Sequence, residues 1–160
     1  DYMKERKPRT YLQSIGFGHL GVGIPYAIGA KLAKPDARVF NIVGDGSFLF
    51  NVQELDTATS YDIPFVTIIA DNNCWGMIRN AEKRKFKRRE QFCVDLKGRD
   101  YIAIAKGFGC YAEKVEDPNE LAGALQRVVD SNKPAVLHVP IKMVAPKNAK
   151  LLASFRSIKF

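Results

Sequence analysis

The sequence predicts an α/β fold, with a doubly wound, mostly parallel sheet and helices on both faces. Three observations support this prediction. Short runs rich in β-branched and aromatic residues recur along the chain, as in strands that are buried on both faces. Segments with helical periodicity separate these runs, and glycine, proline or asparagine stands at most boundaries. Strands and helices that alternate in this way form βαβ units with right-handed crossovers.

The length and composition fit one globular domain. The chain has 160 residues and 46% hydrophobic residues, enough for a core of its own. It shows no secretory signal and no apolar run of the roughly 20 residues that cross a bilayer. Cys74, Cys93 and Cys110 form no C-x-x-C pair, which argues against a disulfide framework or a zinc site and favours the cytoplasm. The first residue, Asp1, favours a fragment of a longer enzyme over the small subunit of a split one.

The N-terminal third is expected to form two strands joined by a turn and a helix. The first strand is Tyr11–Ile15, and the glycine-rich turn Gly16–Gly23 follows it. The helix runs from about Ile24 to Ala33, with Pro25 near its first turn, where the missing amide costs little. The apolar run Val39–Val43 is the second strand.

The middle of the chain is expected to form a helix, a strand and a loop. The helix extends from about Phe48 to Ser60, and apolar residues recur along one of its faces, namely Leu49, Val52, Leu55 and Ala58. Pro64 precedes the strand Phe65–Ala70. A loop or short helix then passes through Trp75 and Ile78.

The C-terminal part is expected to form a helix, Tyr101–Phe108, a strand, Tyr111–Val115, and a second helix from Asp117 to about Val129. The last strand is Ala135–Val139, in which His138 alternates with apolar residues and is expected to be structural. The tail from Ile141 onward is weakly patterned.

A basic run contributes much of the formal charge of +8, and it covers residues 83–89. It has three interpretations: a solvated face, a lid that binds a phosphorylated or coenzyme-A-type substrate, or a nucleic-acid site. Phe86 is its one aromatic residue, which is too little for a base-stacking platform, and no nucleic-acid partner is expected.

Two polar clusters follow neighbouring apolar runs. Gly44–Ser47 comes directly after the second predicted strand, and Asp71–Asn73 comes after the third. Parallel strands bind ligands at their carboxyl ends, so both clusters are expected in one crevice. The backbone amides of Gly46 and Ser47, and the Ser47 hydroxyl, would face an anion such as a phosphate group.

These clusters contain oxygen ligands that suit a hard cation. Asp45 offers a carboxylate, Asn72 a carboxamide oxygen, and a backbone carbonyl near Cys74 is a third candidate. Asn73 would replace Asn72 if the strand ended one residue later. A simpler alternative makes Asp45 a helix cap and Asn72 a turn residue.

The first turn also contains a literal G-x-G-x-x-G pattern, formed by Gly16, Gly18 and Gly21. An NAD-binding dehydrogenase domain is therefore a formal alternative, with Asp36 as the acidic residue. However, Asp36 follows Pro35 in a turn before the second strand, whereas the pattern requires it at that strand's end.

Gly44-Asp45-Gly46, followed later by Asp71-Asn72, resembles the thiamine diphosphate signature Gly-Asp-Gly…Asn-Asn. The flanking stretches resemble the acetolactate synthase group of these enzymes over residues 21–30, 44–55 and 75–78. The resemblance covers about residues 10–140 and implies a thiamine diphosphate-binding fold there. Residues 1–9 would be a lead-in and residues 141–160 a C-terminal tail. One departure is Asp71, which replaces the first asparagine of the signature and adds a carboxylate near the metal.

The resemblance implies a role for each matching position. Asp45, Asn72 and the Cys74 carbonyl would hold Mg²⁺ on the diphosphate. The Leu20 side chain would bend the cofactor, and the Gly18 carbonyl would accept a hydrogen bond from its amino group. Plain packing is the simpler alternative for Leu20 and Met77. The implied cofactor-binding residues are Gly18, His19, Leu20, Gly44, Gly46, Ser47 and Met77.

The resemblance also implies an activity, which is to make or break C–C bonds next to a carbonyl. Decarboxylation or carboligation of 2-oxo acids such as pyruvate is expected. A 2-hydroxyacyl-CoA lyase or aldehyde lyase is the alternative, since acetolactate synthases usually carry a Gln-Trp pair that this chain lacks. A glutamate that activates the cofactor is expected in a pyrimidine-binding domain of the same chain or a partner chain. The isolated chain should therefore hold no catalytic residue and be inactive, within a homodimer or tetramer. FAD could bind elsewhere in the full-length enzyme.

Overall fold

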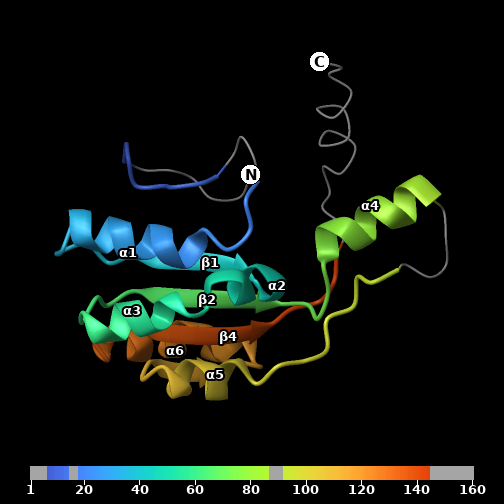
Figure 1. Cartoon of the computed structure of the whole chain (residues 1–160). Helices are drawn as coiled ribbons and strands as arrows, with labels where there is room; N and C mark the ends of the chain where they lie inside the picture. Colours follow the sequence, from blue (N-terminus) through green and yellow to red (C-terminus); the bar gives the residue numbers. More distant parts are fainter. Residues whose placement is uncertain (1–6, 15–17, 87–91, 145–160) are drawn as a thin grey trace.

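The computed structural model describes residues 7–14, 18–86 and 92–144. Four parallel strands in these residues form one sheet with the order β1-β2-β4-β3 (Figure 1). The strands are β1 (Phe40–Gly44), β2 (Val66–Asp71), β3 (Tyr111–Lys114) and β4 (Ala135–Pro140). The predicted α/β fold with a parallel sheet is confirmed.

Helices connect the strands on both faces of the sheet (Figure 1). The first half contains α1 (Gly23–Ala33), α2 (Asp45–Phe48), the 3₁₀ turn η1 (Leu49–Asn51) and α3 (Glu54–Ser60). The second half contains α4 (Gly76–Phe86), α5 (Tyr101–Gly107), the 3₁₀ turn η2 (Pro118–Glu120) and α6 (Leu121–Asp130). In the described part of the chain, no helix is long and apolar enough to cross a membrane.

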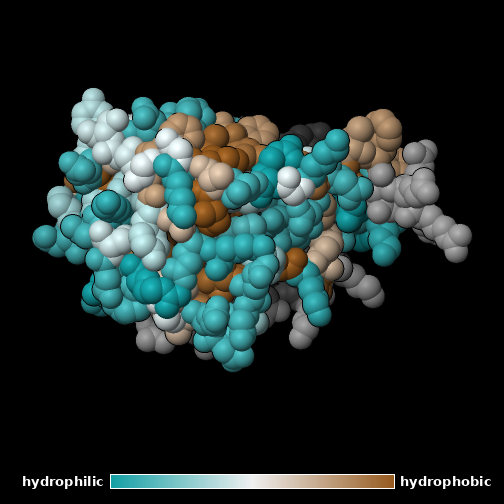
Figure 2. Space-filling model, turned by 90° about the horizontal axis from the view of Figure 1, so that it is seen from below, coloured by the Kyte–Doolittle hydropathy of each residue, from teal (hydrophilic) through white to brown (hydrophobic). Residues whose placement is uncertain are grey.

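The larger core lies between the sheet and α1, α2, α3 and α5. Its residues come from both strands and helices, and several are fully buried, for example Leu55, Ile69, Ala105 and Val136. On the opposite face, α6 covers β2 and β4 through Ala124 and Val128. That face is open beside β1, where the Ile42 side chain is 61% exposed. Seen from below, the surface is mostly hydrophilic, with separate hydrophobic areas between polar side chains (Figure 2).

Aspartate side chains cap the first turns of α5 and η2 and so fix where these segments begin. The Asp100 carboxylate accepts a hydrogen bond from the Ala103 amide at 2.9 Å and starts α5. The Asp117 carboxylate accepts from the Asn119 amide at 2.9 Å, and Pro118 occupies the first position of η2.

Two predicted elements differ from the structure. Residues 11–14 form no strand, and Ile15 lies outside the described residues. The side chains of Tyr11 and Leu12 are exposed. Neither hydrogen bonds to a neighbouring strand nor burial of these side chains therefore stabilises an extended conformation there. The helix predicted over 48–60 is divided into α2, η1 and α3, because α2 begins three residues early, at Asp45, and the chain turns again near Asn51.

Several predictions lie partly outside the described residues. The lead-in is described only at residues 7–9, and the glycine-rich turn only from Gly18 onward. Residues 83–86 of the basic run belong to α4, while residues 87–89 are not described. The tail is described over 141–144. There, the Ile141 amide donates a hydrogen bond to the Asp71 carbonyl oxygen at 2.7 Å, which holds this segment against the end of β2.

Candidate functional site

The carboxyl ends of β1 and β2 lie side by side. The two strands are parallel neighbours, and their register pairs Gly44 with Ala70. The next residue of each chain segment is an aspartate, Asp45 on α2 and Asp71 at the end of β2. The sheet therefore brings the two polar clusters together at one edge, as their positions after the strands predict.

Asp45 is a buried carboxylate with an unsatisfied oxygen. Its side chain is 3% exposed. The Oδ1 atom accepts a hydrogen bond from the Gly46 amide at 2.9 Å, whereas the buried Oδ2 atom has no hydrogen-bond partner among the described residues. Buried polar atoms in native proteins nearly always have a partner, so an orphaned carboxylate oxygen fits a site for a cation.

Residues 71–74 form a tight turn next to Asp45. The Asp71 Oδ1 atom accepts from the Asn73 amide at 2.9 Å, and the Asn72 Oδ1 atom accepts from the Cys74 amide at 3.1 Å. Asn73 has a φ of +54°, a left-handed conformation that asparagine tolerates. The Cys74 carbonyl oxygen accepts from the Gly76 amide at 2.8 Å and keeps a second lone pair for another partner.

The two carboxylates influence each other. Burial, and then the neighbouring Asp71 carboxylate, raise the pKa of Asp45 to about 6. Burial alone would also raise the pKa of Asp71, but hydrogen bonds from the Asn73 amide and from His138 outweigh it and hold that pKa below its usual value. As the pH rises, Asp71 therefore loses its proton before Asp45 does. Below about pH 6, a cation would have to displace the proton of Asp45.

The pKa of Asp45 predicts how stability and metal binding vary with pH. The raised pKa means that Asp45 keeps its proton to a higher pH in the folded, metal-free chain than in the unfolded chain. The stability that this proton contributes is present below pH 4, the usual pKa range of an aspartate, and is lost as the pH rises to about 6. Since Mg²⁺ needs the carboxylate, its affinity should fall by up to about tenfold per pH unit below pH 6.

Thermal unfolding of the metal-free wild type and of Asp45→Asn between pH 4 and pH 7 checks this expectation. Asparagine cannot ionise, so only the wild type should lose stability as the pH rises through this range. The unfolding free energy of Asp45→Asn should therefore increase relative to that of the wild type. A difference in unfolding free energy that is constant over the range would contradict the assignment.

The glycine-rich turn is tied to the same edge by Ser47. The Gly21 amide donates to the Ser47 Oγ atom at 2.9 Å, and the Asn51 Nδ2 atom donates to the Gly21 carbonyl oxygen at 3.1 Å. Gly21 has a φ of +83°, and a Cβ atom there would lie 2.6 Å from the Phe50 Cβ atom. The turn and η1 thus approach more closely than any larger residue at position 21 would permit.

The other predicted cofactor residues surround this edge at the surface. Gly18 has a φ of +61°, and Gly18, His19 and Leu20 lie in the exposed turn before α1. The Leu20 side chain is 49% exposed, and that of Met77, near the start of α4, is 78% exposed. Both side chains are thus open to solvent in the described structure, whereas Asp45 is buried.

The comparisons with known proteins identify the family of the chain. Residues 1–139 match the family described as "Thiamine pyrophosphate enzyme, C-terminal TPP binding domain". The chain belongs to this family. Thiamine pyrophosphate is another name for thiamine diphosphate, so the match confirms the resemblance in the sequence.

Two of the relatives are named acetolactate synthases. The chain is 40% identical over 156 residues to a probable acetolactate synthase large subunit of Methanococcus aeolicus, covering 94% of this chain and 26% of the relative. It is 39% identical over 140 residues to that of Methanocaldococcus jannaschii, covering 88% and 24%. This thiamine diphosphate-binding domain thus spans about a quarter of the length of these relatives, and it is acetolactate synthase-like.

A solved structure shows the same fold in a related enzyme. It is a thiamine diphosphate-dependent 4-hydroxybenzoylformate decarboxylase from Rhodococcus jostii RHA1. The TM-score is 0.74 at 31% identity, over 79% of this chain and 24% of that one. The thiamine diphosphate-binding fold is therefore shown by structure as well as by sequence.

The structure adds contacts near these residues that sequence patterns do not contain. A Cβ atom on Gly46 would lie 2.4 Å from the Trp75 ring, which also makes an edge contact with Phe50 at 6.0 Å between centroids. The Asn72 Nδ2 atom lies 3.6 Å from the Met143 sulfur, in the segment after β4. Spacing along the chain carries no signal for these contacts, because each joins separate elements.

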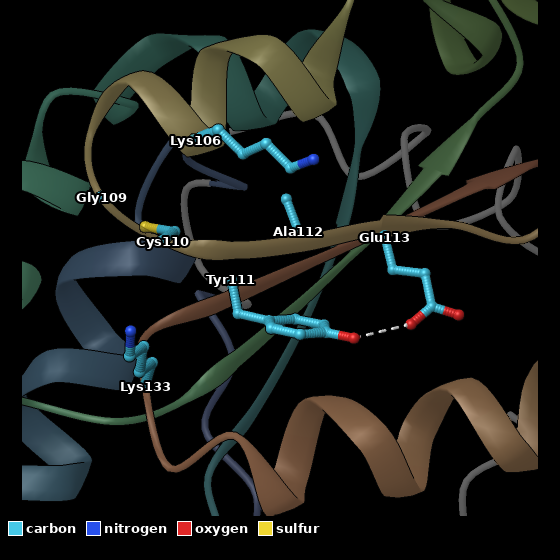
Figure 3. Close-up of a pocket in the computed structure, with 7 residues that line it drawn as sticks. All are labelled: Lys106, Gly109, Cys110, Tyr111, Ala112, Glu113 and Lys133. Carbon is cyan, nitrogen blue, oxygen red and sulfur yellow. Dashed lines mark hydrogen bonds between the residues drawn. The ribbon is translucent and has the colours of Figure 1, made fainter.

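A hollow of about 500 Å³ lies elsewhere on the domain, beside the edge strand β3. Figure 3 shows its lining, in which the Tyr111 hydroxyl donates to the Glu113 carboxylate at 3.1 Å. Its lining residues are Lys106, Gly109, Cys110, Tyr111, Ala112, Glu113 and Lys133. None of them is a predicted cofactor or metal residue, so this hollow is separate from the site.

Proposed function

We propose that this domain binds thiamine diphosphate and Mg²⁺ in an enzyme that makes or breaks C–C bonds next to a carbonyl. Decarboxylation or carboligation of 2-oxo acids such as pyruvate is the favoured chemistry. The names of the acetolactate synthase relatives support this proposal. The structural observation that carries it is the buried, unpartnered Asp45 Oδ2 atom where β1 and β2 end.

Asp45, Asn72 and the Cys74 carbonyl oxygen would hold the metal ion. Among the described residues, no three His, Cys, Asp or Glu side chains group as metal ligands, so a site here depends on one carboxylate and neutral oxygens. That ligand set suits Mg²⁺, which takes few ligands from the protein and keeps oxygens from phosphate and water.

The chain's other residues would hold and shape the cofactor. Gly44, Gly46 and Ser47 border the metal ligands and would contact the diphosphate, with Ser47 also keeping the glycine-rich turn in place. Gly18, His19 and Leu20 would meet the cofactor's rings from that turn, and Met77 would line the pocket from α4. Thiamine diphosphate supplies a nucleophilic carbon and an electron sink when bound. The protein's part is to orient it and to exclude water.

A further domain would complete the active site. We place the cofactor-binding domain at residues 10–140, between a lead-in at 1–9 and a tail at 141–160. The glutamate that activates the cofactor would come from a pyrimidine-binding domain of the same chain or a partner chain, in a homodimer or tetramer. The open outer side of the site, with Leu20 and Met77 exposed, supports a covering partner there.

A 2-hydroxyacyl-CoA lyase or aldehyde lyase of the same family is a second candidate. The observation in its favour is the basic end of α4, where Lys83, Arg84 and Lys85 are exposed on the helix that starts beside the metal ligands. Exposed cations at this place would suit a substrate with a phosphorylated tail.

The isolated chain should bind Mg²⁺–thiamine diphosphate weakly and convert no substrate. The physical reason is that half of the cofactor's contacts, and the activating glutamate, would lie in the other domain. Isothermal titration calorimetry with and without Mg²⁺, together with an assay of pyruvate consumption, checks both statements. Steady turnover of pyruvate by the purified 160-residue chain would contradict the proposal that a second domain supplies the activating glutamate.

A further inference from the structure

A buried histidine–aspartate contact lies next to the proposed metal ligands. The His138 Nε2 atom is 2.8 Å from the Asp71 Oδ2 atom, and the two side chains are 7% and 5% exposed. The sheet explains their meeting, because β2 and β4 are parallel neighbours whose register pairs Ile69 with His138. Alternation along β2 puts Asp71 on the same face as Ile69, which is the face of the larger core.

The orientation of the histidine ring is fixed from its other side. The Tyr101 ring packs edge-on against it, with 5.0 Å between centroids and 68° between planes. Tyr101 is itself fully buried and makes a second edge contact with Phe48 of α2. A carboxylate only accepts hydrogen bonds, so the Nε2 atom of His138 must be the protonated nitrogen that donates to Asp71.

Asp71 is in turn joined to the residues that would hold the metal. Its Oδ1 atom accepts from the Asn73 amide and so shapes the turn that presents Asn72 and Cys74. The Asn73 amide donates to one oxygen of Asp71 and His138 contacts the other, so this carboxylate joins the turn to β4.

We propose that Asp71, pinned by His138, is a positioning residue that holds the 71–74 turn in the shape needed to bind the metal ion. This inference rests on the proposed function, since it concerns the same cation. The Asp71 carboxylate acts through the turn, and His138 acts through Asp71. Outer partners of metal ligands commonly govern affinity in this way, with losses of about 10–100-fold when they are removed.

The rival explanation is that the pair only stabilises the core. The two explanations differ in what they predict for metal affinity in a folded variant. His138→Leu removes the donor, whereas His138→Gln can still present a donor nitrogen to Asp71. Thr67→Val is a matched control on β2, because Thr67 is fully buried and accepts a hydrogen bond from the Asn41 Nδ2 atom at 3.2 Å.

Calorimetric titration of the full chain with Mg²⁺ in the presence of thiamine diphosphate measures the affinity. We expect His138→Leu to weaken Mg²⁺ binding by about 10–100-fold, with His138→Gln near the wild type. Thr67→Val should lower the unfolding temperature without changing the affinity. If His138→Leu does not fold, Asp71→Asn replaces it, with a loss of about tenfold expected. An unchanged affinity in a folded His138→Leu or Asp71→Asn variant would overturn the inference and leave the proposed function standing.

Amide hydrogen exchange in the metal-free chain supplies a second readout. Loss of the His138 donor should speed exchange at the Asn73 amide, while Thr67→Val should leave that amide protected. Unaltered exchange at Asn73 in His138→Leu would refute the link between the pair and the turn. If the wild-type chain bound no Mg²⁺ and no thiamine diphosphate, the proposed function would fall, and this inference would fall with it.

Discussion

Replacement of Asp45 by asparagine is expected to abolish Mg²⁺-dependent binding of thiamine diphosphate, with a loss of at least roughly 100-fold in affinity. Asp45 is the one carboxylate in the proposed ligand set, and its Oδ2 atom is buried without a partner. The fold should survive, because asparagine has nearly the same size and needs no charge in this buried position. Calorimetry measures the affinity, and circular dichroism confirms the fold.

Asp36→Asn is the matched control for this experiment. Asp36 is an exposed aspartate in the loop between α1 and β1, and it is the acidic residue that an NAD-binding interpretation would require. Its replacement should leave Mg²⁺ and cofactor binding unchanged. Wild-type affinity in Asp45→Asn would rule out the ligand assignment, and a loss of affinity in Asp36→Asn would show that general surface charge governs binding.

Replacement of Gly46 by alanine is expected to have the second largest effect. The added Cβ atom would lie 2.4 Å from the Trp75 ring, so the ring must move and give up its edge contact with Phe50. Overpacking of this kind costs about 1–3 kcal/mol of unfolding free energy. The shift of Trp75 should also widen the junction between α2 and the 71–74 turn, and so weaken cofactor binding by at least about tenfold.

Gly44→Ala provides the comparison within the same motif. A Cβ atom at Gly44 meets nothing within 4 Å, and the φ of −76° is open to alanine, so the unfolding free energy should change little. Trp75 is the single tryptophan of the chain, and its fluorescence reports on the packing directly during urea unfolding. An unshifted emission maximum and full stability in Gly46→Ala would show that the ring yields without cost.

Some features of the site could be predicted from residues that are adjacent in the sequence. The strand ends before Asp45 and Asp71 follow from apolar runs that stop at a polar residue, and the structure places both at one edge. Other features depend on how elements pack. The Ser47 Oγ atom accepts a hydrogen bond from the Gly21 amide, a contact between separate segments that no pattern around Ser47 contains. The strand expected at residues 11–15 fails for a similar reason, because residues 11–14 lack a strand to pair with.

By itself, the sequence determined the alternation of strands and helices, the family, and the polar residues that follow β1 and β2, because these are encoded in short stretches of chain. Only the tertiary structure decided which of those residues meet. His138 has an ordinary place in an apolar strand, and its partner Asp71 lies 67 residues earlier. The strand order β1-β2-β4-β3 makes them neighbours, and periodicity along one strand does not record the order in which strands are laid side by side.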